Sequence, residues 1–163
     1  MLDFVANERL AVTIGQHSVA GRKSVNQDFH GTLVPDNSAL TLKGIALALA
    51  DGISSSNVSH VAAETAVKSF LTDYYCTSDA WSVKTSGQRV IWATNSWLNA
   101  QTYRNRLEED ADRGFVCTFS AMVIKGRAAH VFHVGDSRIS RIVGGSLEQL
   151  TTDHRTILSS TEN

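Results

Sequence analysis

Three aspartates interrupt or end apolar stretches of the sequence. Asp28 lies in VNQDFHG, Asp51 in LADGIS and Asp136 in HVGDSR. Carboxylates that converge from strand ends supply the oxygen ligands that Mg²⁺ or Mn²⁺ takes in near-octahedral geometry. Gly52, directly after Asp51, lets the backbone approach closely, so its carbonyl is a further candidate ligand. We therefore expect a divalent metal site built from these residues.

A single Asp-Gly pair has a simpler explanation. Aspartate and glycine are both favoured in turns, because aspartate bonds to nearby backbone and glycine tolerates positive φ. The segment GIALALADGISSS, residues 44–56, is then a strand that meets a turn. Three such acids in one chain favour the metal site, but their spacing alone leaves both interpretations open.

Hydrophobic periodicity predicts the elements that would position these acids. Residues 10–19 alternate apolar and polar side chains and predict a half-buried strand. Residues 31–34 predict a short strand that ends at the turn-like PDNS, and residues 45–50 predict an apolar strand between two glycines. Apolar residues at three-to-four spacing predict helices over 57–75 and 86–109.

The rest of the chain predicts a meander of strands. We expect strands over 115–124, 128–134, 138–143 and 147–150, joined by turns at Lys125-Gly126 and Gly144-Gly145. Strands, then two helices, then hairpin strands indicate an α+β fold with helices packed on a mostly antiparallel sheet.

Composition describes a globular domain with balanced charge. The chain has 163 residues, 42% of them hydrophobic, and a formal net charge of -1. This balance gives no reason to expect a nucleic-acid partner. Cys76 and Cys117 are far apart and form no CxxC motif, which favours two reduced thiols. With no signal-peptide pattern at the N-terminus and no long apolar run, we expect a cytoplasmic protein.

Five segments resemble successive motifs of the PPM family, the metal-dependent type 2C serine/threonine protein phosphatases. In chain order they are GRKSVNQD, LADGISSS, VCTFSAMVI, HVGDSR and LTTDH. The resemblance implies an antiparallel β-sandwich flanked by helices, in four layers (α-β-β-α). The longer segment AGRKSVNQDFHG is similar to bacterial members in which this domain precedes a protein kinase domain.

The resemblance implies a role for each acid. Asp51 would bridge two metal ions, Mn²⁺ or Mg²⁺, and the Gly52 carbonyl would complete one of them. Asp28 would orient metal-bound water, and Asp136 would serve an additional, weaker metal position. Two cations lower the pKa of a shared water and neutralise phosphoryl oxygens, so that hydroxide attacks in line. The implied reaction is hydrolysis of phosphoserine or phosphothreonine in proteins.

The chain departs from the family pattern near the first acid. Lys23 stands where members usually have arginine, and Arg22 precedes it. Either would hold the substrate phosphate, although guanidinium binds two oxygens at once and ammonium is a point charge. Gln27 replaces a common glutamate and would accept a hydrogen bond from metal-bound water without adding charge. Ile53 stands where histidine or methionine is usual.

The family domain continues past LTTDH and supplies two further aspartates, which have no counterpart after His154. We therefore interpret residues 1–163 as a single partial phosphatase domain, the N-terminal two-thirds, incomplete at its C-terminus. Metal binding is expected to be weak or absent in this fragment, and its own activity stays open. The expected partners are a phosphoprotein substrate, a kinase domain in the same full-length chain, and a second copy bound through exposed sheet edges.

Two other functions remain open. A degenerate, non-catalytic phosphatase-like module that regulates a partner kinase is favoured by Lys23, Gln27, Ile53 and the missing acids. A different metal-dependent hydrolase could use the same strand-end carboxylates.

Several other polar residues have structural interpretations. His130 and His133 lie three apart on one strand and therefore on opposite faces, so they form no metal pair. His154 is interpreted as structural, Arg138 is expected to pair locally with a carboxylate, and Cys117 is expected to be an inert buried thiol.

Overall fold

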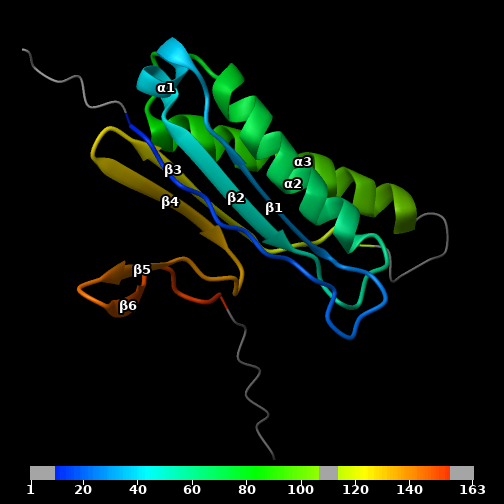
Figure 1. The fold of residues 1–163 in the computed structure, drawn as a ribbon. Coiled ribbons are helices and arrows are strands. Elements are labelled where there is room, and N and C mark those ends of the chain that lie inside the picture. Colours follow the sequence, from blue (N-terminus) through cyan, green and yellow to red (C-terminus); the bar gives the residue numbers. More distant parts are fainter. Residues whose placement is uncertain (1–9, 107–113, 155–163) are drawn as a thin grey trace, which may run out of the picture.

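The structure, a computed structural model, describes residues 10–106 and 114–154. Its elements are β1 (Asp28–Leu33), α1 (Asn37–Lys43), β2 (Ile45–Asp51), α2 (Ser59–Cys76), α3 (Val83–Arg106), β3 (Phe119–Lys125), β4 (Ala128–Val134), β5 (Ser140–Val143) and β6 (Ser146–Gln149). An antiparallel sheet of order β1-β2-β3-β4 carries α2 and α3 on one face, and β5 and β6 form a separate hairpin (Figure 1). The predicted α+β class with antiparallel sheets is confirmed.

The core lies between α2, α3 and the face of the sheet that they cover. Small side chains on β2 and α2 let the helix approach the sheet closely, and aromatic rings fill the remaining space. Its buried members include Ala46, Ala48 and Ala50 of β2, Ala63, Ala66, Val67, Phe70 and Tyr74 of α2, and Phe119, Ala121 and Val123 of β3.

The opposite face of the sheet is partly open. Leu49 is 43% exposed and Val131 is 37% exposed on this side. Residues 14–17 run across this face beside β1, β2 and β3 and line a hollow with them (Figure 1). The strand predicted over 10–19 is therefore wrong: this segment crosses the face instead of pairing along an edge, and most of its side chains are exposed.

The sequence-based prediction missed one helix, α1. The residues interpreted as a turn after Pro35 begin α1, which ends at Gly44, where φ is 81° and the backbone N–H donates to the Leu40 carbonyl at 2.9 Å. The buried Lys43 ammonium donates to the Thr77 carbonyl at 2.7 Å and the Ser78 carbonyl at 2.9 Å. This lysine fastens α1 to the end of α2.

The other elements agree with the prediction except at their ends. The strand over 45–50 and the helix over 57–75 are confirmed as β2 and α2. β1 begins earlier than predicted, at Asp28, and β3 begins later, at Phe119, because Cys117 pairs only through an isolated bridge to Gly52. The predicted end of α3 at Glu109 lies outside the described residues. No helix in the described ranges is long and apolar enough to cross a membrane.

Candidate metal centre

Asp28 and Asp51 face each other across β1 and β2. Asp28 is the first residue of β1, Asp51 is the last residue of β2, and the antiparallel register makes them direct partners. Side chains of opposed residues point to the same face of a sheet. The structure thus brings two of the predicted site residues together on the open face.

This pairing changes the acidity of Asp51. Burial raises the pKa of its carboxyl, and the negative charge of Asp28 raises it further. The charge of Lys23 lowers this pKa, and the charge of Asp136 adds a smaller increase. Two adjacent carboxylates cannot both ionise without cost, and a divalent cation between them removes that cost. The pair is therefore chemically suited to bind a hard cation.

Asp136 lies near this pair but does not complete a metal cluster. It follows Gly135, whose φ is 108° and where a Cβ atom would lie 2.7 Å from the Cβ of Thr118. Its charge reaches Asp51, as the pKa increase indicates. Within residues 10–106 and 114–154, no group of three or more His, Cys, Asp or Glu side chains is arranged to hold a metal ion. Of the three acids predicted to converge, Asp28 and Asp51 form a pair, and Asp136 acts on Asp51 only weakly through its charge.

Thr118 fixes the backbone of Asp51 from the neighbouring strand segment. Its N–H donates to the Asp51 carbonyl at 2.8 Å, and its hydroxyl accepts the Asp51 N–H at 3.1 Å. Neither bond involves the Asp51 carboxyl, so this group is available to bind a ligand. The sequence analysis assigned no role to this threonine, although it lies within the quoted segment VCTFSAMVI.

Gly52 is required by packing. A Cβ atom at this position would lie 2.7 Å from the carbonyl carbon and oxygen of Ser59, in the first turn of α2. Its N–H donates to the Gln27 carbonyl at 3.0 Å, and it forms an isolated bridge with Cys117. None of these bonds uses the Gly52 carbonyl, which stays a candidate ligand. Packing against α2 therefore explains the glycine at position 52 without reference to a metal.

Gln27 holds the loop that follows Asp51. Its Nε2 donates to the Ile53 carbonyl at 3.3 Å, the Ser56 carbonyl at 3.0 Å and the Ser59 hydroxyl at 2.8 Å. Carbonyl oxygens need a donor, so a glutamate here would face them with a second set of acceptors. The replacement of glutamate by glutamine thus has a local cause. Oε1, the atom that would accept the expected bond from metal-bound water, lies 3.4 Å from the Lys23 ammonium.

Lys23 is a cation whose charge reaches Asp51 and lowers the pKa of its carboxyl. Its ammonium donates to the Ser54 hydroxyl at 3.1 Å and to Oε1 of Gln27 at 3.4 Å, beside a hollow lined by residues 54–57 and His60. Arg22 lies in the same turn, is exposed, and pairs with no carboxylate of the described segments. Of the two predicted phosphate ligands, the structure places Lys23 near the acid pair.

A second network ties the segment after β4 to the sheet. The Ser120 hydroxyl lies 2.9 Å from Nδ1 of His133 and 2.8 Å from the Ser137 hydroxyl. Arg138 donates from Nε to the Asp153 carboxylate at 2.9 Å and from a terminal nitrogen at 2.6 Å. The predicted local pairing of Arg138 with a carboxylate is confirmed. These bonds position the loop that carries Asp136.

The sequence profile described as protein phosphatase 2C matches residues 16–162. The chain belongs to the protein phosphatase 2C family. This membership accounts for the order of the five quoted segments. Comparison with curated proteins gives no match.

Solved serine/threonine phosphatases share the fold of this phosphatase 2C chain. The S. agalactiae enzyme is 28% identical, with a TM-score of 0.60 over 82% of this chain and 52% of that one. The catalytic domain of PstP in complex with two manganese ions is 25% identical, with a TM-score of 0.60 over 80% of this chain and 50% of that one. PstP/Ppp of Mycobacterium tuberculosis is 23% identical, with a TM-score of 0.60 over 85% of this chain and 52% of that one. At this identity the likeness shows the fold alone. The chain spans about half the length of the phosphatases it matches.

Proposed function

We propose that the intact protein hydrolyses phosphoserine or phosphothreonine in proteins by means of a metal-activated water. The observation that carries this proposal is the Asp28–Asp51 pair, two opposed carboxyls of which one has a raised pKa. Membership of the protein phosphatase 2C family and likeness to a phosphatase that binds two manganese ions support it.

The residues have distinct parts in this proposal. Asp51, Asp28 and the Gly52 carbonyl form an all-oxygen donor set suited to Mn²⁺ or Mg²⁺, and Asp136 offers a further, weaker position. When bound there, the metal supplies a water of lowered pKa and neutralises phosphoryl oxygens. Lys23, beside the acid pair, binds and orients the substrate phosphate, with Arg22 as a second cation of the same turn. Thr118 and Gln27 keep the backbone around the acids in place.

Residues 1–163 form a partial domain in this proposal. Two close carboxylates bind a divalent cation less tightly than a larger set, so we expect weak Mn²⁺ binding by the chain as given. A kinase domain in the same full-length chain, a cytoplasmic location and a homodimer through the exposed edges β1 and β4 stay predictions. A monomeric mass by light scattering at micromolar concentration would contradict the homodimer.

One observation favours a second function, a non-catalytic module that regulates a kinase. Gln27 and Lys23 are engaged with the loop after Asp51 by hydrogen bonds to Ser54 and Ser56. Polar groups used to hold a loop are less available to hold water or phosphate. In this alternative the intact protein binds no Mn²⁺.

The test combines calorimetry with hydrolysis of a phosphoserine peptide by the full-length protein. We expect Mn²⁺ to bind and to support hydrolysis, and Asp51→Asn to abolish both. Asp73→Asn is the matched control, because this exposed aspartate lies near the far end of α2. Full activity of the Asp51 variant would refute the assignment. Absence of Mn²⁺ binding would favour the regulatory module, and hydrolysis of small phosphoesters alone would indicate a different metal-dependent hydrolase.

A further inference from the structure

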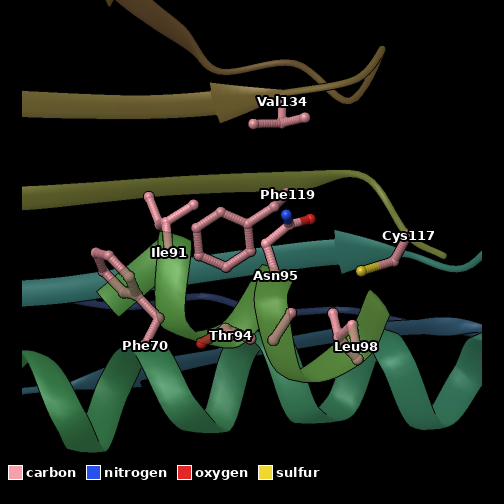
Figure 2. Close-up of a pocket in the computed structure, with 9 residues that line it drawn as sticks. Phe70, Ile91, Thr94, Asn95, Leu98, Cys117, Phe119 and Val134 are labelled. Carbon is pink, nitrogen blue, oxygen red and sulfur yellow. The ribbon is translucent and has the colours of Figure 1, made fainter. Parts of the chain in front are cut away.

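A small cavity lies between α2, α3 and the segments around the ends of β3 and β4, with a volume of about 80 Å³. Its walls are mostly apolar, and the two helices and the strands all contribute to them (Figure 2). The lining residues are Ala66, Phe70, Ile91, Thr94, Asn95, Leu98, Cys117, Phe119 and Val134. The cavity opens to solvent beside the exposed residues Asn95 and Val134, so a small molecule can enter it directly.

The polar groups of the cavity are few. Thr94 and Asn95 of α3 contribute the polar side chains, and the Cys117 sulfur points into the space (Figure 2). Burial raises the pKa of the Cys117 thiol to about 11, so this wall is uncharged at neutral pH. An apolar interior with one or two polar groups is typical of small-molecule sites.

Two walls of the cavity continue directly into the segments that carry the acids. Cys117 forms the bridge to Gly52, and the next residue, Thr118, bonds both backbone groups of Asp51. Val134 ends β4 immediately before Gly135 and Asp136. Cys117 is therefore connected to Asp51 through at most two residues and two hydrogen bonds.

We propose that this cavity binds a compact apolar molecule with one polar end, and that its occupation shifts the Asp51 backbone through the Gly52–Cys117 bridge. The ligand class follows from the volume and lining: a short branched aliphatic alcohol or amide fills the space and directs its polar end to Thr94 and Asn95. Packed interiors transmit small displacements because they have little free volume. The binding part stands by itself, whereas control of catalysis rests on the function proposed above.

Isotope-resolved NMR of the 163-residue chain, without metal, tests binding and coupling together. Xenon and isobutanol are the probes. We expect saturable shifts of the Ala66 and Leu98 methyl signals, with isobutanol binding in the millimolar range because so small a ligand makes few contacts. The Gly52 and Thr118 amide signals should titrate with the same midpoint. The Gly126 amide, in the β3–β4 turn, serves as the remote control.

Two variants separate the cavity from general effects of the probes. Ala66→Val places extra methyl groups in the cavity and should weaken isobutanol binding at least about tenfold. Ala100→Val makes the same chemical change at an exposed position of α3 and should leave binding unchanged. If Ala66→Val does not fold, Leu98→Ala enlarges the cavity and should admit benzene, which we expect the smaller cavity of the parent chain to exclude.

Each outcome decides one part of the proposal. Linear, unsaturable shifts of the methyl signals would show that the cavity binds neither probe and would overturn the proposal. Saturable methyl shifts with unchanged Gly52 and Thr118 amides would overturn the coupling. Mn²⁺ titration of the full-length protein, with and without isobutanol, then measures the effect on the metal site. Failure of Mn²⁺ to bind at all would refute the proposed function and leave the ligand site standing.

Discussion

Removal of one carboxylate from the Asp28–Asp51 pair should stabilise the metal-free protein. Asp51→Asn keeps the shape of the side chain and the two backbone bonds to Thr118, but removes the partly buried charge. The gain follows from the opposed positions of the two carboxyl groups. A metal site accepts such repulsion between its ligands because the bound cation relieves it.

The magnitude follows from the opposed position of the two acids. Unit charges roughly 4 Å apart repel by about 1 kcal/mol with the screening of bulk water and by about 4 kcal/mol at an effective dielectric constant of about 20. Asp28 is exposed and the Lys23 charge opposes the repulsion, so the lower figure applies. We expect a gain of about 1 kcal/mol at neutral pH, or about 2–4 °C in Tm for a chain of this size.

The pH dependence has a definite sign. Because the pKa of Asp51 is raised in the folded state, the folded protein binds this proton more tightly than the unfolded chain does. Below the ordinary pKa of aspartate both states are protonated and the pair has no cost. Stability is then lost as the pH rises through the raised pKa, and it levels off above it. Asp51→Asn should lack this decline.

Urea unfolding in the presence of a chelator, at about pH 4 and at pH 7, measures the effect. Asp73→Asn, an exposed carboxylate on α2, is the control for a general change of net charge. Added Mn²⁺ should stabilise the parent chain and not the Asp51 variant. A variant less stable than its parent at pH 7, or an equal gain in the control, would refute the repulsion between Asp28 and Asp51.

Three further outcomes follow from packing and burial. Gly52→Ala should lower the free energy of unfolding by about 2 kcal/mol because its Cβ would overlap the first turn of α2, whereas Gly15→Ala, with nothing within 4 Å, should be neutral in urea unfolding. Lys43→Met should cost about 2–3 kcal/mol, measured in the same way, because it removes three hydrogen bonds from a buried ammonium; an unchanged midpoint would contradict that role. Dithionitrobenzoate at about pH 8 should label exposed Cys76 quickly and partly buried Cys117, whose thiol pKa is raised, slowly, and Cys76→Ser should abolish the fast phase; a fast phase that survives would show that Cys117 is accessible.

The errors in the secondary-structure prediction have identifiable physical causes. Pro35, Asp36 and the two residues after them are favoured both in turns and at helix starts, so local preference could not distinguish a turn from α1. Residues 10–19 have the alternation of a strand, but a strand needs a partner edge, and this segment lies across the face of the sheet. In contrast, α2 was predicted well because its helical pattern is long, and β2 because its short apolar run lies between two glycines.

The sequence by itself determined which residues have the right chemistry: acids at strand ends, a glycine after Asp51, a cation before Asp28, and the order of motifs that places the chain in its family. Only the tertiary structure decided which of them meet. The register of β1 on β2 sets Asp28 opposite Asp51, Asp136 stays outside the pair, and the amide of Gln27 holds the adjacent loop. These outcomes depend on contacts between residues distant in the chain, and the spacing of residues within one segment does not encode such contacts.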